Sequence, residues 1–291
     1  MSVAISSSFS QKVRDYGVLV KFKLNLLVVF SAAMGYLMAS SVSFSWSQFA
    51  LLCFGGFLVT GASNALNQLF EKDVDILMPR TADRPIAKGR ISVTAAALAA
   101  GLMSVLGLVI LASFNLLTAV LGALSLLSYV FVYTPMKRIS PIAVLIGAFP
   151  GAFPTLIGWV AVTGNITIGA FALFGIQFLW QFPHFWSIAW KAYDDYAKAG
   201  FFLLPTGKKD KNSAMQIVLY CVFLLAVGMF PYFLGISGMI SMIIVALAAA
   251  YFTYTAVKLY QLQTDKAALA VMFASFFYLP IVQIALLLDK V

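Results

Sequence analysis

The chain has 291 residues, of which 62% are hydrophobic and only 10% are charged, whereas about 25% of the residues of a typical soluble domain are charged. This balance excludes a soluble domain, a disordered chain and a nucleic-acid-binding module, because each of them needs more charge or polar surface than the sequence holds. The formal net charge of +9 must therefore be explained by where the positive residues lie along the chain, as in membrane proteins.

Nine apolar runs follow one another, and each is long enough to cross a bilayer as a helix of about 20 residues. Runs this continuous predict helices, because barrel strands would alternate over about ten residues. We therefore predict an all-α integral membrane protein with one transmembrane domain over 1–291, a cytoplasmic segment at 1–20 and nine helices around a central cavity. The predicted spans lie near residues 24–41, 47–66, 92–113, 115–134, 141–162, 168–190, 214–235, 238–258 and 268–288.

The charged residues lie almost entirely on one side of this topology. With nine spans, 18 of the 19 Lys and Arg residues fall on the same side, and only Lys290 falls on the other. The positive-inside rule makes that side cytoplasmic and predicts a cytoplasmic N-terminus. Nine of the ten Asp and Glu residues, all but Asp289, lie there too. Any ionic chemistry is therefore predicted at this face.

The first polar island of the sequence ends the second predicted helix. Asn67, Glu71 and Asp75 recur every four residues, and Asn64 lies one turn earlier, so two amides and two carboxylates line one helical face. Such groups at membrane depth are costly unless they face a cavity, a partner or an ion. Their oxygen atoms are the ligands that Mg²⁺ prefers. A solvated helix end with paired charges is the alternative interpretation.

Cations and a tyrosine lie close to this stripe in the predicted topology. Arg80 and Arg84 follow it directly, and Tyr133, Lys137 and Arg138 close the fourth span. Guanidinium and ammonium groups beside a carboxylate stripe predict a clamp for a diphosphate. For Lys137 and Arg138, anchoring at the cytoplasmic face explains the charges equally well.

The second polar island closes the sixth span and contains His184, the single histidine of the chain. Aromatic and acidic residues surround it in the sequence: Trp180, Phe185, Trp186, Asp194 and Asp195. A histidine inside a span is either a hydrogen-bonded packing residue or a group for proton transfer, carboxylate contact or iron ligation. Both islands end helices on the same predicted face, which indicates one shared pocket.

These motifs resemble the UbiA superfamily of intramembrane prenyltransferases, which have nine helices. The superfamily signature Asn-x-x-x-Asp-x-x-x-Asp appears as Asn67-x-x-x-Glu71-x-x-x-Asp75, and the Tyr-x-x-x-Lys element matches Tyr133 and Lys137. Within the superfamily, the segments 64–75, 78–85, 151–159, 183–186 and 195–200 are similar to those of the protoheme IX farnesyltransferases, or haem O synthases.

The resemblance implies that farnesyl diphosphate and haem B are the substrates and Mg²⁺ the cofactor. The farnesyl group would join a vinyl group of haem B, with water addition and release of diphosphate. The implied metal ligands and catalytic residues are Asn67, Glu71, Asp75, Asp194 and Asp195, with His184 as a further catalytic residue. The implied diphosphate-binding residues are Asn64, Arg80, Arg84, Tyr133, Lys137, Arg138 and Lys23. The implied haem and prenyl pocket consists of Trp180, His184, Phe185 and Trp186.

The resemblance also implies a cell inner membrane with cytoplasmic active-site loops, rather than the mitochondrial inner membrane. The implied partners are the lipid bilayer and proteins of terminal-oxidase biogenesis, with no nucleic acid. One departure is Lys21-Phe22-Lys23-Leu24, where the family usually has Lys-Pro-Arg-Leu, so position 23 keeps a charge but loses the bidentate fork of arginine.

Two alternative functions stay open at this point. A quinone-pathway aromatic prenyltransferase would share the first motif, but such relatives carry a second motif of spaced aspartates that this sequence lacks. An ion-coupled transporter would also place carboxylates inside spans, but its charged partners are expected near the midplane, whereas here they gather at one face.

Overall fold

The computed structural model describes residues 9–40 and 44–291. The first eight residues of the predicted cytoplasmic segment and residues 41–43 of the first outer loop lie outside this part. The regular secondary structure of the described residues is helical, apart from one isolated β-bridge between Ser237 and Lys290. Its elements are α1 (Phe9–Leu19), α2 (Phe22–Ala39), α3 (Trp46–Asp75), α4 (Val93–Ala112), α5 (Leu116–Leu127), η1 (Ser128–Tyr133), α6 (Thr134–Met136), α7 (Ala143–Thr163), α8 (Ile168–Lys191), α9 (Tyr193–Lys198), α10 (Lys211–Gly228), α11 (Phe230–Phe233), α12 (Met239–Leu262) and α13 (Asp265–Leu288).

Eight segments in the described ranges are long and apolar enough to cross a membrane, and they match eight of the nine predicted spans. Two of them combine several elements: α5, η1 and α6 form the segment Leu116–Met136, and α10 and α11 form Lys211–Phe233. The sixth predicted span corresponds to α8, which is 24 residues long but carries the polar residues Gln177, Gln181 and His184. The all-α membrane fold is therefore confirmed, while the count of nine spans and the side of the N-terminus stay predictions.

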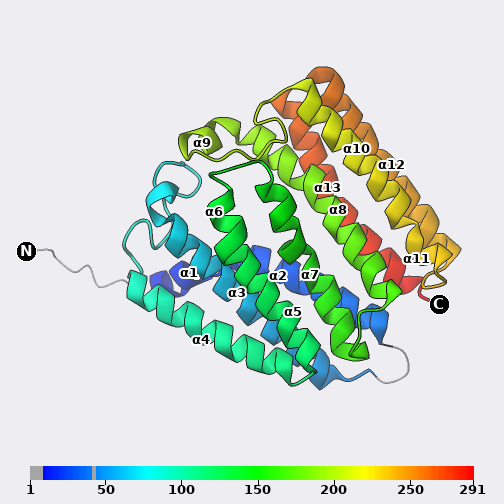
Figure 1. Cartoon of the computed structure of the whole chain (residues 1–291), viewed down its shortest axis with the longest axis horizontal. Coiled ribbons are helices and arrows are strands. Elements are labelled where there is room, and N and C mark those ends of the chain that lie inside the picture. Colours follow the sequence, from blue (N-terminus) through cyan, green and yellow to red (C-terminus); the bar gives the residue numbers. More distant parts are fainter. Residues whose placement is uncertain (1–8, 41–43) are drawn as a thin grey trace, which may run out of the picture.

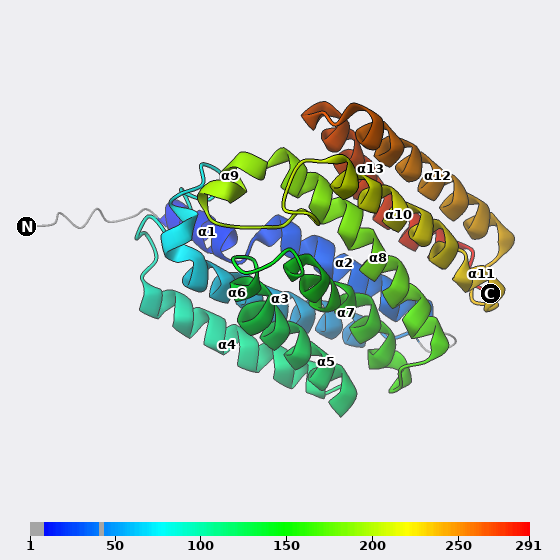
Figure 2. The ribbon, with the colours of Figure 1, turned by 45° about the horizontal axis from the view of Figure 1, so that its top comes forward.

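The bundle has two groups of outer helices around a central layer (Figures 1 and 2). In one group, α12 packs against α10 and α13, which both pack on α8; the other group consists of α3, α4 and α5. Between them, α2 packs closely against α7, and α7 against α8. A Cβ atom at Gly158 would collide with the carbonyl of Ala32, and one at Gly35 with the carbonyl of Thr155. Small residues thus let the backbones of α2 and α7 approach, as in many membrane helix pairs.

The two ends of the bundle differ in polarity. At one end, Lys290 donates hydrogen bonds to the carbonyls of Leu37 and Ser40, and Asp289 accepts one from the amide of Ser241 in the first turn of α12. These charges stabilise helix ends. At the other end, α9 lies beside the loop that follows α3 (Figures 1 and 2). The two predicted islands are therefore brought to the same end of the bundle.

Candidate active site

The polar stripe on α3 is buried as the helical spacing predicts. The exposed fractions of Asn64, Asn67, Glu71 and Asp75 are 3%, 1%, 6% and 1%, whereas Asp73 on the opposite face is exposed. α3 continues to Asp75, so all four side chains lie on one regular helix. The stripe thus faces the interior of the bundle, which is the arrangement that a buried ion or charged ligand requires.

Each carboxylate of the stripe is paired with a cation. Nζ of Lys137 lies 2.6 Å from Oε1 of Glu71, and Nη1 of Arg84 lies 2.6 and 2.7 Å from the two carboxylate oxygens of Asp75. Arg84 also lies 3.9 Å from Oε2 of Glu71. These side chains are nearly sealed from solvent, so neither partner can be removed without leaving a buried charge unpaired.

Asn67 connects two further segments to the stripe. Its Oδ1 accepts a hydrogen bond from Nζ of Lys21 at 3.3 Å, and its Nδ2 donates to Oγ1 of Thr134 at 3.2 Å. Lys21 adopts a left-handed backbone conformation with φ of 48° at the turn between α1 and α2, which is rare for residues other than glycine. Lys23, which the resemblance implies as a diphosphate-binding residue, is exposed on α2, and neither Lys21 nor Thr134 was predicted as a site residue.

Lys21 is the cation of this site whose charge responds to pH near neutrality. Burial, and after it the nearby cations Arg84 and Lys137, lower the pKa of its ammonium from 10.5 to about 7. The carboxylate of Glu71 acts in the opposite direction. A bound anion would favour the charged form and raise this pKa again.

The helix break before Lys137 explains how this lysine reaches α3. Pro135 cannot donate a backbone hydrogen bond, and the chain before it forms the π-helical turn η1, a feature that often marks functional sites. Lys137 lies 4.8 Å above the ring of Tyr133. That ring packs against Gly147, where a Cβ atom would come within 2.6 Å of it. Gly147 on α7 therefore leaves the space in which Tyr133 and Lys137 meet.

The second island meets the first through aromatic residues. Arg80 donates to the hydroxyl of Tyr196 at 3.4 Å, Lys137 lies 5.5 Å above the ring of Phe201, and the Phe202 amide donates to the Lys137 carbonyl. One pocket for both islands is thus consistent with these contacts. Phe201 carries no charge and lies one residue beyond the resembling segment 195–200, so no signal in the sequence indicated it.

The acidic pair of the second island is placed differently from the stripe. Asp195 pairs with Lys198 on α9 at 3.3 Å, and Asp194 is exposed. Neither carboxylate forms an ion pair with the first island within the described part of the chain. Arg138 next to Lys137 is exposed as well. The roles of these three residues stay predictions.

His184 lies at the contact between α8 and α13. Its Nδ1 is 2.7 Å from Oγ of Ser275, and its ring stacks on Trp180 at 4.5 Å. Trp180 in turn donates from Nε1 to the Ser275 carbonyl at 2.8 Å. Phe185 meets His184 edge-on, whereas Trp186 packs against Phe182 and Tyr220 towards α10. The predicted aromatic pocket is therefore split, and Ser275 is a partner that the sequence did not reveal.

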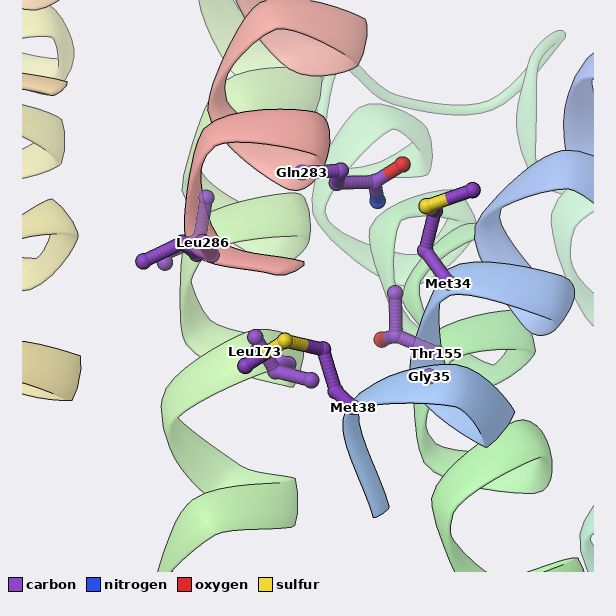
Figure 3. A pocket seen from close by; sticks show the side chains of 8 residues that line it. Met34, Gly35, Met38, Thr155, Leu173, Gln283 and Leu286 are labelled. Carbon is purple, nitrogen blue, oxygen red and sulfur yellow. The ribbon is translucent and has the colours of Figure 1, made fainter. Parts of the chain in front are cut away.

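A layer of buried amides lies deeper between α2, α8 and α13. Gln283 donates to Gln177 at 3.1 Å and to Ser31 at 3.3 Å, and Gln177 donates to the Gly151 carbonyl. A small cavity beside Gln283 is lined by Met34, Met38, Leu173 and Leu286 (Figure 3). It has room for about one water molecule. This cavity therefore does not hold a prenyl chain in the described conformation.

The α3 stripe has the donor atoms that a magnesium ion needs. Asn67, Glu71 and Asp75 present amide and carboxylate oxygens from one buried helix face, and hard cations prefer such ligands. No group of three acidic, histidine or cysteine side chains gathers in the described ranges. The stripe thus supplies two carboxylates and one amide, and phosphate oxygens of the substrate and water would complete the coordination.

Comparison with known sequences identifies the family. The model of the UbiA prenyltransferase family matches residues 28–279. A protoheme IX farnesyltransferase of Flavobacterium johnsoniae is 44% identical over 283 residues, covering 95% of this chain and 94% of that protein. A protein of the same name from Cytophaga hutchinsonii is 47% identical over 278 residues, covering 95% of this chain and 97% of that protein.

The fold is also similar to solved structures. A structure of digeranylgeranylglyceryl phosphate synthase has a TM-score of 0.81 and 22% identity, over 96% of this chain and 98% of that chain. A UbiA homologue from Archaeoglobus fulgidus bound to GPP and Mg²⁺ has a TM-score of 0.71 and 15% identity, over 94% of this chain and 99% of that chain. These two likenesses concern the fold alone. Together with the matching family model and the curated relatives, they lead to one assignment: the chain belongs to the UbiA prenyltransferase family.

Proposed function

We propose that this chain transfers the farnesyl group of farnesyl diphosphate to a vinyl group of haem B, with addition of water and release of diphosphate. The observation that carries the proposal is the buried stripe of α3, where Asn67, Glu71 and Asp75 hold the cations Lys21, Lys137 and Arg84 at one end of the bundle. The identity of 44% and 47% to two protoheme IX farnesyltransferases supports haem B as the acceptor.

The chemistry asks the protein to stabilise a leaving diphosphate. Lys137 and Arg84 are held by the carboxylates of the stripe, so they are positioned before the substrate arrives. Such preorganised donors bind a leaving group more tightly as negative charge develops on it. Mg²⁺ bound to Asn67, Glu71 and Asp75 would neutralise part of the diphosphate charge.

The organic part of the reaction needs a dry, aromatic environment. Trp180 and Phe185 flank His184 on α8, and aromatic faces stabilise a cation such as the one that develops on the allylic carbon. The vinyl carbon of haem supplies the electron pair, so no serine or cysteine nucleophile is needed. Cys221 is buried and Cys53 partly buried, which agrees with a packing role for both.

The cellular setting belongs to the same proposal. The family and the apolar helices indicate a multi-pass membrane protein. We propose that it resides in a cell inner membrane, with the charged end of the bundle in the cytoplasm, where 18 of the 19 Lys and Arg residues would then lie. Proteins of terminal-oxidase biogenesis are the proposed partners, because they use the product.

Product analysis tests the proposal. Purified protein receives farnesyl diphosphate with haem B or, in parallel, with an aromatic acid, each with and without Mg²⁺. We expect farnesylated haem only in the reaction that contains haem B and Mg²⁺. Prenylation of the aromatic acid would instead identify a quinone-pathway enzyme, and uptake of an ion into vesicles without any prenyl product would identify a transporter.

A further inference from the structure

The position of the proton on His184 follows from its hydrogen bonds. Oγ of Ser275 lies 2.5 Å from the carbonyl oxygen of Met272. Two oxygens this close need a proton between them, and a carbonyl can only accept. The single hydroxyl proton of Ser275 must therefore point to Met272. Because Nδ1 of His184 lies 2.7 Å from the same Oγ, it is this nitrogen that donates the proton.

The surroundings of His184 favour an uncharged imidazole. Its ring is in contact with Trp180, Phe185 and Phe276, and burying an unpaired charge among aromatic rings is costly. With the proton on Nδ1, the other ring nitrogen, Nε2, carries a free lone pair. In the described ranges, Nε2 makes no hydrogen bond, and it is not among the side-chain atoms that are both sealed from solvent and unpaired. Nε2 therefore keeps some accessible surface and an unused lone pair, on a residue that is 8% exposed overall.

This pattern is typical of histidines that bind a metal. A metal-ligating histidine almost always donates its second ring N–H to a fixed acceptor, which sets the tautomer and raises the basicity of the ligating nitrogen. We propose that Nε2 of His184 ligates the iron of the haem substrate and that Ser275 is its positioning residue. This inference rests on the proposed haem-dependent function and decides how His184 contributes to it.

A contact with a haem propionate does not fit the same geometry. A carboxylate can only accept hydrogen bonds at neutral pH, and Nε2 without a proton has none to donate. An apolar face beside the histidine suits a porphyrin instead: the rings of Phe185 and Phe276 meet the His184 ring edge-on and are 37% and 43% exposed. Ser275 fixes this geometry through two atoms, because its carbonyl also holds the stacked Trp180.

Absorption spectra of purified protein with ferric haem B test the ligation. Wild-type protein is expected to show the Soret band of histidine-ligated haem, and His184→Ala to lose it. Added imidazole is expected to restore the band in His184→Ala, which also shows that this variant is folded. A Soret band in His184→Ala that equals that of wild type without imidazole, or a failure of imidazole to restore it, would overturn the ligation.

Resonance Raman spectra of the ferrous protein test the role of Ser275. Ser275→Ala removes the acceptor, so the iron–histidine stretching frequency should fall and haem affinity should drop by about tenfold or more. Ser187→Ala is the matched control, because Oγ of Ser187 donates to the His184 carbonyl and not to the ring. An unchanged frequency in Ser275→Ala would overturn the positioning role. Formation of farnesylated haem by wild type is measured in parallel, so a failure of the proposed function is recognised separately.

Discussion

The end of α3 and the contact between α8 and α13 are two polar regions inside this bundle, and they differ in charge. At α3, buried carboxylates and cations neutralise each other at distances of 2.6 to 2.7 Å. At α8 and α13, uncharged groups dominate, and His184 is held by a hydroxyl and a stacked indole. The difference indicates a division of work, with the charged region suited to a diphosphate and the uncharged one to a planar apolar acceptor.

Glu71→Gln is expected to have the largest effect on the charged region. The change removes the carboxylate that holds Lys137 and is proposed to bind Mg²⁺, so the rate of product formation should fall by about 100-fold or more. Steady-state kinetics with haem B and farnesyl diphosphate measure it. The matched control is Asp73→Asn, which changes an exposed carboxylate of the same helix and should leave the rate unchanged. Equal rates for Glu71→Gln and wild type would remove Glu71 from the site.

The variants Lys137→Met and Arg138→Met compare a buried and an exposed cation of the same segment. Lys137 is buried against Glu71 and Tyr133, whereas Arg138 is exposed. Loss of a hydrogen bond to a charged group costs about 1.5–3 kcal/mol, so KM for farnesyl diphosphate should rise about 10- to 100-fold in Lys137→Met. Arg138→Met should change KM little. A larger effect from Arg138→Met would mean that the diphosphate lies outside the buried stripe.

The pH dependence of KM for farnesyl diphosphate tests whether the ammonium of Lys21 contacts the diphosphate. Its pKa of about 7 in the free protein means that the ammonium loses its proton as the pH rises through 7. If the diphosphate binds the charged form, binding takes up a proton above pH 7, and KM should rise by up to about tenfold per pH unit. Lys21→Arg stays charged and should show a flat profile between pH 7 and 9. A wild-type KM that does not change over this range would contradict a contact between Lys21 and the diphosphate.

Substitution of Arg80 is expected to have the smallest effect on KM for farnesyl diphosphate. Its guanidinium is exposed and contacts Tyr196 at 3.4 Å, and exposed contacts of this kind contribute about 1 kcal/mol or less. Arg80→Ala should therefore raise KM by no more than about fivefold, and Tyr196→Phe by less. Kinetics of both variants at two salt concentrations measure this. A loss comparable to that of Glu71→Gln would show that Arg80 turns into the site during the reaction.

The sequence alone predicted those parts of the fold and of the site that depend on the periodic spacing of residues along one helix. Apolar run length predicted the helices, and the four-residue spacing of Asn67, Glu71 and Asp75 predicted one buried face of α3. Both follow from the geometry of a single helix, which local sequence determines. The charge count likewise predicted that Asp289 and Lys290 lie apart from the islands.

The partners of these residues could not be predicted, because they come from distant segments. Thr134 reaches Asn67 because a π-helical turn shifts the register after residue 127, and Ser275 meets His184 across 91 positions of the chain. Neither residue type is unusual in a membrane helix. Lys21 was missed in favour of Lys23 because the left-handed conformation at the α1–α2 turn has no signature in a lysine.

Binding measurements on two variants test the division of work most directly. Farnesyl diphosphate and ferric haem B are each titrated into wild type, Glu71→Gln and His184→Ala. We predict that Glu71→Gln loses Mg²⁺-dependent binding of farnesyl diphosphate and keeps the wild-type haem spectrum, and that His184→Ala shows the reverse. The division of work would be contradicted if either variant lost binding of both ligands, or if both variants kept wild-type binding of both ligands.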